Sequence, residues 1–277
     1  MLLSQVTSNS FFLSFIKKLK YAKLTDNCVA ARRPENKNKN RYRNVLPYDA
    51  NRVKLAGSDD YMNASHVRLN LAGGRAYLSY LACQGPLPNT THDFWRMVWE
   101  QKAQVIAMVT QEVEASKVKC HRYWPDTSMV VCEGCLEISK VKQRSLANVG
   151  VSWLSMRDTA TGETHPVMHL NYTTWPDHGA PLNALPLLRY IRLVHLSENT
   201  SDPAPIVVHC SAGIGRTGAF ITIDAALKMV QHDSKVDIQK IVQDLRRQRQ
   251  GMIQTKDQYV FCYQALLQAL QSLLPSA

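Results

Sequence analysis

A cysteine and an arginine stand six positions apart in residues 208–218, a spacing that could bind and attack a phosphate group. The apolar residues 205–208 predict a buried strand, and residues 219–227 predict a helix. The loop between them therefore lies at a helix N-terminus, where free N–H groups and the helix dipole favour an anion. Arg216 can offer its planar fork of donors to two phosphate oxygens.

The same field acts on the thiol of Cys210. A thiolate beside a guanidinium at a helix N-terminus is stabilised, so its pKa falls below the ordinary thiol value. Cys210 is therefore expected to be an anionic nucleophile at neutral pH and to form a phosphocysteine.

Three glycines of the loop also match a dinucleotide-binding pattern. Gly213, Gly215 and Gly218 spell G-x-G-x-x-G between the predicted strand and the predicted helix. This alternative is disfavoured because it explains neither Cys210 nor Arg216.

The loop resembles the signature of the cysteine-dependent protein tyrosine phosphatases. Further motifs follow in that family's order, so the resemblance covers about residues 36 to 270, and the stretches 84–88 and 93–101 look most like non-receptor members that carry FERM or PDZ modules. The motifs are N-R-Y-R-N-V-L-P-Y-D at 40–49, D-Y-M-N-A-S at 60–65, Q-G-P-L-P at 84–88, F-W at 94–95, K-C at 119–120 with Y-W-P at 123–125, W-P-D-H-G at 175–179 and Q-T-K-D-Q at 254–258.

The resemblance implies roles for residues outside the loop. Asp177 would be the general acid and then the general base, carried by a lid with Trp175 near its hinge. Gln254 would position the hydrolytic water with Gln258 as its companion, and Thr217 would hydrogen-bond the departing thiolate.

Other matched residues concern the walls of the site. Tyr42 would stack on a phosphotyrosine ring and set the depth of the pocket, while Lys119 would lie beside the closed lid. Glu114 would orient Arg216, and His209 would hold the loop. The predicted catalytic residues are Cys210, Asp177, Arg216, Gln254, Thr217 and His209; the predicted substrate-binding residues are Tyr42, Asn44, Lys119, Asp177, Ser211, Ala212, Gly213, Ile214, Gly215, Arg216, Gln254 and Gln258.

One position departs from the family pattern. Asn44 stands where the family usually has an aspartate that holds the substrate backbone. An amide lacks the full charge of a carboxylate, which predicts weaker or altered peptide affinity.

The resemblance therefore implies hydrolysis of phosphotyrosine in proteins without a metal or another cofactor. The alternative is a pseudophosphatase that binds phosphotyrosine without turnover. Loss of Cys210, Arg216 or Asp177 would signal that alternative, and all three are present.

Composition is compatible with a globular enzyme. The chain has 277 residues, seven cysteines and a net charge of +11. A reactive thiol favours a reducing cytoplasm, with the membrane cytoskeleton as an alternative reached through other domains of a parent protein. We expect phosphotyrosine-containing proteins as partners, no nucleic acid, and a monomer.

The expected organisation is an N-terminal helical segment and linker at 1–35, then one catalytic domain at 36–274. The apolar start predicts a helix packed on the domain, and a membrane-surface helix is the less favoured interpretation. The domain is predicted to be α/β (α+β), with a twisted mixed β-sheet flanked by helices. Expected elements are a central strand at 104–110 and helices at 92–102, 182–197, 238–249 and 258–274.

Overall fold

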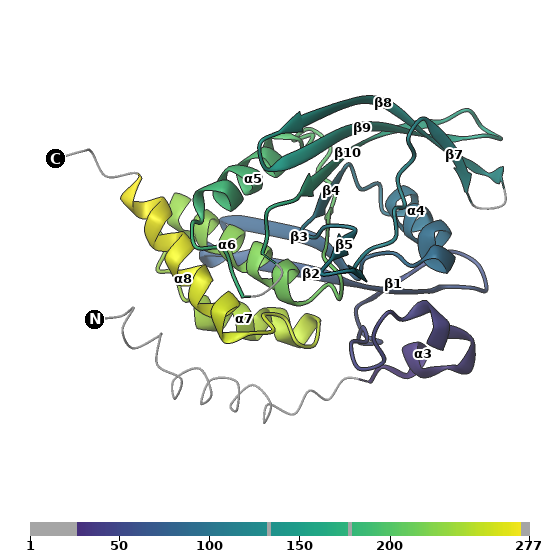
Figure 1. Cartoon of the computed structure of the whole chain (residues 1–277). Helices are drawn as coiled ribbons and strands as arrows, with labels where there is room; N and C mark the ends of the chain where they lie inside the picture. The colour runs from purple at the N-terminus through teal and green to yellow at the C-terminus, as the bar shows by residue number, and fades with distance from the viewer. Residues whose placement is uncertain (1–26, 132–133, 177–178, 273–277) are drawn as a thin grey trace.

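The computed structural model describes residues 27–131, 134–176 and 179–272 (Figure 1). The expected N-terminal helix and the predicted acid Asp177 lie outside these residues. Helices are α3 Val29–Arg32, η1 Pro34–Lys39, η2 Ala72–Gly74, η3 Pro88–Thr90, α4 Thr91–Glu100, α5 Leu185–Leu196, α6 Gly215–Gln231, α7 Ile238–Gln248 and α8 Lys256–Gln271. Strands are β1 Arg52–Lys54, β2 Tyr61–Leu71, β3 Ala76–Cys83, β4 Val105–Met108, β5 Val113–Glu114, β6 Lys117–Val118, β7 Ser128–Val131, β8 Leu136–Leu146, β9 Val149–Asp158, β10 Thr164–Tyr172 and β11 Ile206–His209.

A nine-stranded mixed sheet crosses the molecule in the order β1-β2-β3-β11-β4-β10-β9-β8-β7. The central strands β3, β11, β4 and β10 run parallel, and the outer strands pair antiparallel. Helix α4 covers one face, while α5 to α8 cover the other (Figure 1). The predicted fold class is therefore confirmed. Within the described residues, none of the helices has the length and apolar character needed to cross a membrane.

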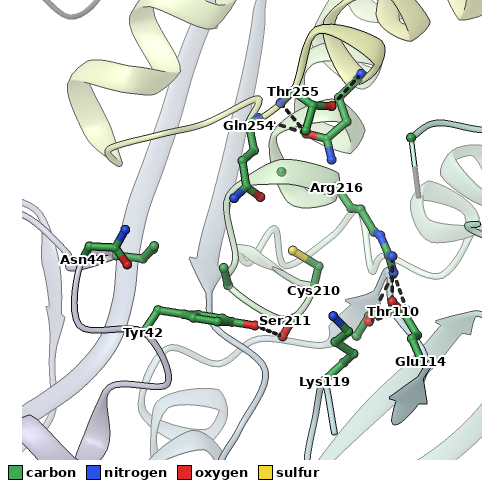
Figure 2. Close-up of a pocket in the computed structure, with 15 residues that line it drawn as sticks. Tyr42, Asn44, Thr110, Glu114, Lys119, Cys210, Ser211, Arg216, Gln254 and Thr255 are labelled. Carbon is green, nitrogen blue, oxygen red and sulfur yellow. Dashed lines mark hydrogen bonds and ion pairs between the residues drawn. The ribbon is translucent and has the colours of Figure 1, made fainter. Parts of the chain in front are cut away.

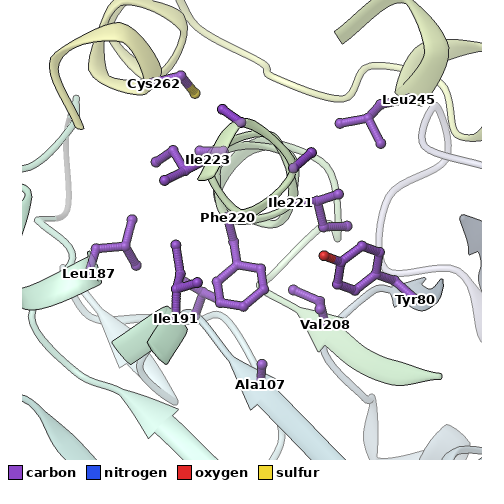
Figure 3. Packing of buried hydrophobic residues seen from close by; sticks show 14 of the residues in the cluster. Tyr80, Ala107, Leu187, Ile191, Val208, Phe220, Ile221, Ile223, Leu245 and Cys262 are labelled. Atoms are coloured by element: carbon purple, nitrogen blue, oxygen red, sulfur yellow. The ribbon is translucent and has the colours of Figure 1, made fainter. Parts of the chain in front are cut away.

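Alternating side chains of the central strands build a core on each face of the sheet. Val207 belongs to the cluster under α4, whereas Val208 belongs to the cluster under α6. Successive side chains of a strand point to opposite faces, so a strand covered on both sides is apolar throughout. Figure 3 shows Phe220 of α6 packed among Val208, Ala107 and residues of α5. These contacts fix the start of α6 relative to the end of β11.

The expected elements agree with the observed ones, with small shifts at their ends. The predicted central strand is β4, and the four predicted helices are α4, α5, α7 and α8. Helix α8 begins two residues earlier than expected because Thr255 forms a capping box with Gln258.

The polar residues at the end of the expected N-terminal segment and linker, 1–35, belong to packed structure. The amide of Asn36 donates to the carbonyl of Ala30 at 2.8 Å, and Asn36 is buried. The carboxylate of Asp49 accepts the backbone N–H groups of Val29 and Ala30 at 2.6 and 3.0 Å, which caps α3. Residues from α3 onward therefore pack against the rest of the fold.

A partly buried ionic cluster joins α5, α6 and β3. Asp224 accepts hydrogen bonds from the hydroxyl of Tyr80 at 2.5 Å and from Nε2 of His195 at 2.8 Å. Nδ1 of His195 also contacts Glu198. Burial alone would lower the pKa of His195, but the two carboxylates raise it to about 9. His195 is therefore a cation at neutral pH.

Candidate active site

A pocket of about 490 Å³ opens where β11 ends and α6 begins (Figure 2). Its lining contains many residues predicted from the motifs, together with Val45, Thr110, Gly179 and Thr255. Asp177 lies outside the described residues, while Gly213, Ile214, Thr217, His209 and Trp175 are buried and do not belong to the lining. The predicted residues that line the pocket are Tyr42, Asn44, Glu114, Lys119, Cys210, Ser211, Ala212, Gly215, Arg216, Gln254 and Gln258.

Cys210 lies in the pocket, almost fully buried. Burial raises the pKa of its thiol, but the hydroxyl and N–H of Thr217, the charge of Arg216 and the N–H of Gly213 outweigh it. The pKa of Cys210 is therefore below the ordinary thiol value. A thiolate in this position is a nucleophile that faces the space where an anion would bind.

Arg216 is held by a carboxylate before any substrate arrives. Its two terminal nitrogens donate to the two oxygens of Glu114 at 2.5 and 2.8 Å, in a bidentate pair. Burial raises the pKa of Glu114, but its bonds with Arg216, Gln111 and Thr110 hold the pKa below its usual value. Glu114 is therefore a carboxylate at neutral pH and fixes the guanidinium of Arg216 beside Cys210.

The shape of the loop depends on Gly213. Its φ of +69° lies in the left-handed region, and an added Cβ would lie 2.0 Å from the carbonyl oxygen of Cys83. Only glycine fits this turn. The N–H of Gly213 can therefore point toward the thiol of Cys210.

A buried arginine, which the motifs did not reveal, holds the loop from behind. Arg249 has no exposed surface and donates to the carbonyls of Gly213 at 2.8 Å and Ala212 at 3.2 Å. It also donates to Ser65 at 3.1 Å and to Asn63 at 2.8 Å. Nothing in its local sequence marks it, because Arg249 follows a charged helix and resembles a surface residue.

His209 belongs to a buried chain of side chains behind the loop. Its Nδ1 lies 3.3 Å from the carbonyl of Cys210, so Nδ1 carries the proton and Nε2 accepts from the hydroxyl of Tyr123 at 2.7 Å. Tyr123 accepts in turn from Nε2 of His169 at 2.8 Å. Burial lowers the pKa of His209 to about 4 and that of His169 to about 3. Both imidazoles are neutral, and His209 positions the loop without touching the pocket.

Tyr42 forms one wall of the pocket and is partly exposed. Its hydroxyl lies 3.0 Å from the hydroxyl of Ser211. The segment before it is held by Gln84, which accepts from the N–H of Arg41 at 2.9 Å. The guanidinium of Arg41 donates to the carbonyls of Gly85 and Pro86. These bonds fix the ring relative to the loop.

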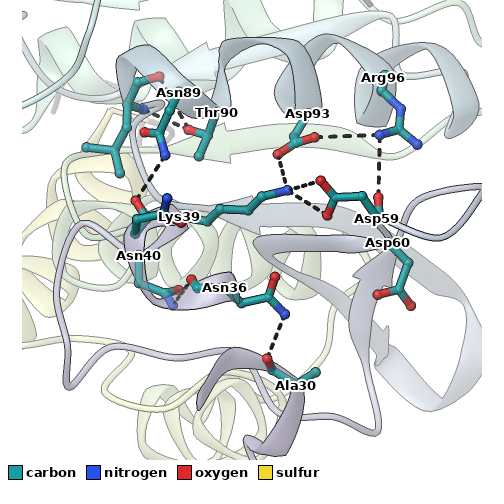
Figure 4. Close-up of polar contacts among 12 residues, drawn as sticks. Ala30, Asn36, Lys39, Asn40, Asp59, Asp60, Asn89, Thr90, Asp93 and Arg96 are labelled. Atoms are coloured by element: carbon teal, nitrogen blue, oxygen red, sulfur yellow. Dashed lines mark hydrogen bonds and ion pairs between the residues drawn. The ribbon is translucent and has the colours of Figure 1, made fainter. Parts of the chain in front are cut away.

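An ion network anchors the other end of that segment. Lys39, at the end of η1, donates to Asp59 at 2.7 Å and to Asp93 of α4 at 2.9 Å (Figure 4). Arg96 lies 3.6 Å from Asp93 and donates to the carbonyl of Ala56. The network joins η1, the β1–β2 loop and α4.

The segment that contains Trp175 and Pro176 contacts Arg216. Its terminal nitrogen donates to the carbonyl of Pro176 at 3.3 Å, and its guanidinium lies 5.8 Å from the ring of buried Trp175. Nearby, the side-chain oxygen of Gln258 accepts the N–H of Gln254 at 2.9 Å. Gln258 thus shapes the segment that presents Gln254.

Comparisons with known proteins agree with this geometry. A model of the protein-tyrosine phosphatase family matches residues 36–268. The chain is 44% identical to tyrosine-protein phosphatase non-receptor type 13 of Homo sapiens over 265 residues, which is 93% of this chain and 10% of that protein.

Two further tyrosine phosphatases are also similar to most of this chain. Non-receptor type 20 of Mus musculus is 42% identical over 262 residues, with 93% of this chain and 59% of that protein covered. Receptor-type tyrosine-protein phosphatase eta of Gallus gallus is 40% identical over 274 residues, with 97% and 19% covered. The chain thus spans less than two thirds of the length of each of these relatives.

Proposed function

Because the chain belongs to the protein-tyrosine phosphatase family, we propose that it hydrolyses phosphotyrosine in proteins through a cysteinyl-phosphate intermediate. One observation carries the proposal: a thiol with a lowered pKa lies in a pocket beside an arginine that a carboxylate already orients. A dinucleotide-binding site, the alternative that the glycine pattern suggests, would need neither the thiol of Cys210 nor the guanidinium of Arg216.

In the first step, the Cys210 thiolate attacks phosphorus, so that a sulfur–phosphorus bond forms and the bond to the tyrosine oxygen breaks. Arg216 and the N–H groups of the loop stabilise the charge of the phosphoryl oxygens. Asp177 gives its proton to the departing tyrosine oxygen, a role that rests on its motif.

In the second step, water attacks the phosphocysteine. Asp177, now a carboxylate, takes a proton from this water, and Gln254 holds the water in line with the sulfur–phosphorus bond. That bond breaks, inorganic phosphate leaves, and the thiolate of Cys210 is restored. The hydroxyl of Thr217 beside the sulfur stabilises this leaving group.

The wall of the pocket supports phosphotyrosine as the substrate. Tyr42 is an aromatic surface at the entrance, while Cys210 lies deep and almost fully buried. A phenyl ring spans the distance between entrance and thiol and can stack on Tyr42. The short side chain of phosphoserine would leave its phosphate short of the sulfur.

Hydrolysis of a phosphotyrosine peptide and of its phosphoserine analogue tests the proposal. We expect turnover of the tyrosine peptide alone, no turnover by Cys210→Ser, and a kcat reduced ~10²- to 10⁴-fold in Asp177→Ala. Gln254→Ala should accumulate a phosphoenzyme, visible by mass spectrometry of the intact protein. The double variant with Cys210→Ser is the control and should show no phosphoenzyme.

Two results would contradict the mechanism. Binding of the phosphotyrosine peptide by wild type without release of phosphate would identify a binding module. Comparable turnover of the phosphoserine peptide would show that Tyr42 does not set the depth of the pocket.

A further inference from the structure

A second hollow of the molecule is strongly basic. It has a volume of about 980 Å³ and lies between α7, the β2–β3 turn and the loop that joins α6 to α7. Figure 1 shows α7 beside β2, and the two elements pack together. We name it the α7 cleft; its charged lining residues are Arg68, Arg75, Lys235, Asp237, Lys240, Asp244 and Arg247.

The two carboxylates of the α7 cleft are already engaged. Asp237 accepts the N–H of Lys240 at 2.9 Å and caps α7, while Asp244 pairs with Arg247 at 2.5 Å. Four cations remain without a carboxylate partner among the residues that the structure describes. They are Arg68, Arg75, Lys235 and Lys240.

The backbone of Arg68, which lines the cleft, is satisfied. The side chain of Gln248 accepts from the N–H of Arg68 at 2.7 Å and donates to its carbonyl at 3.0 Å. This amide occupies the edge of β2 at Arg68 and so obstructs strand addition at that residue. The groups of the cleft that are available to a partner are therefore its cationic side chains.

The end of α7, where Gln248 lines the cleft, lies close in sequence to a contact with the catalytic pocket. Gln250, two residues after the end of α7, donates to the carbonyl of Asn44 at the pocket wall. Helix α7 then leads away for eleven residues, or ~16 Å. An extended peptide of about five residues covers that length.

We propose that the α7 cleft binds an acidic segment of the phosphoprotein substrate, at a distance from the phosphotyrosine. This inference rests on the proposed function. Asp237 and Asp244 interrupt the row of cations, which suits separated carboxylates better than the continuous charge of a nucleic acid. The cations also surround a hollow, whereas a membrane surface needs them on one flat face.

Kinetics with matched peptides test the proposal. One peptide carries phosphotyrosine between neutral residues. Two others add a segment in which glutamates alternate with glycines, through a flexible Gly/Ser linker of about ten residues on the N-terminal or the C-terminal side, and this linker reaches up to ~35 Å. Wild type should show a KM about three- to tenfold lower for at least one acidic peptide, with an unchanged kcat. Added salt should remove the difference.

Two double charge-reversal variants test whether the lower KM of the acidic peptide depends on the α7 cleft. Lys235→Glu with Lys240→Glu should abolish the advantage of the acidic peptide and leave the neutral peptide unaffected. Lys54→Glu with Arg144→Glu changes the net charge equally at exposed positions outside the cleft. This control should keep most of the advantage.

Equal KM values for all peptides in wild type, or an equal loss in both double variants, would overturn the proposal. Failure of the proposed function has a different signature, since no peptide would then release phosphate. In that case, fluorescence anisotropy of the labelled glutamate segment still shows whether the cleft binds it. Saturable binding that Lys235→Glu with Lys240→Glu removes supports it. Binding only of an oligonucleotide or of anionic lipid vesicles contradicts it.

Discussion

Replacing Arg249 with methionine tests how the catalytic loop is held. The guanidinium has no exposed surface, and its four acceptors are neutral oxygens of Gly213, Ala212, Asn63 and Ser65. Methionine keeps much of the volume but donates to none of them. Arg249→Met therefore removes a buried cation and leaves two loop carbonyls unsatisfied.

The size of the effect follows from these contacts. Hydrogen bonds to a charged group contribute ~1.5–3 kcal/mol each, so four contribute roughly 6–12 kcal/mol. Burying the cation costs several kcal/mol, which the methionine avoids. We expect a net loss of about 3 kcal/mol, or roughly 6–12 °C in Tm for a domain of this size.

The same change acts on the thiol of Cys210, the proposed nucleophile. The charge of Arg249 interacts favourably with the thiolate of Cys210, so its removal should raise the pKa of the thiol. The rate of alkylation by iodoacetamide as a function of pH measures this pKa. Its profile should move to higher pH in Arg249→Met, with a fall in kcat at neutral pH.

Arg249→Lys separates charge from geometry. Lysine keeps the cation but lacks the planar fork, so the alkylation profile should stay near that of wild type while Tm falls. An Arg249→Met variant with the Tm and the alkylation profile of wild type would refute the reasoning.

Four further changes probe single features. Asn44→Asp should lower KM for a phosphopeptide several-fold, because a carboxylate accepts backbone N–H groups more strongly; an unchanged KM argues against it. Thr217→Val should raise the pKa of Cys210, and an unmoved alkylation profile would exclude that contribution. The raised pKa of His195 stabilises the fold fully below about pH 6.5, and this contribution is lost as pH rises through about 9. The urea midpoint of wild type should therefore fall over that pH range, whereas the midpoint of His195→Gln should not. An equal fall in both proteins would contradict this prediction. Gly213→Ala should prevent the loop from forming, because the added Cβ would collide with the backbone of Cys83. Gly57→Ala is the control and should stay active, since Gly57 also has a positive φ, +85°, but no atom lies within 4 Å of the added Cβ. Equal activity of the two variants would contradict the predicted collision.

Local patterns were enough to predict the catalytic loop and most elements. The strand before Cys210 and the helix after it follow from short apolar runs, and the spacing to Arg216 predicts the anion site. The start of α8 could also have been predicted, since Thr255 and Gln258 form a capping-box pattern.

The supporting residues could not be predicted in the same way. Arg249 reaches Asn63 across 186 positions of sequence, and Tyr123 reaches His209 across 86. Such partners depend on the fold, which no local pattern specifies. The end of the expected linker is polar, yet the buried amide of Asn36 donates to Ala30, and the amide of Asn40 donates to Ala31 and Asn36.

The position of β11 has a consequence for how the chain folds. This strand lies between β3 and β4, although β4 ends at Met108 and β11 begins at Ile206. A ribosome therefore exposes both neighbours as unpaired edges for about a hundred residues of synthesis before the strand that joins them emerges. Insertion of β11 both closes the sheet and places Cys210 in its loop, so the environment that lowers the pKa of this thiol forms only when the sheet becomes continuous.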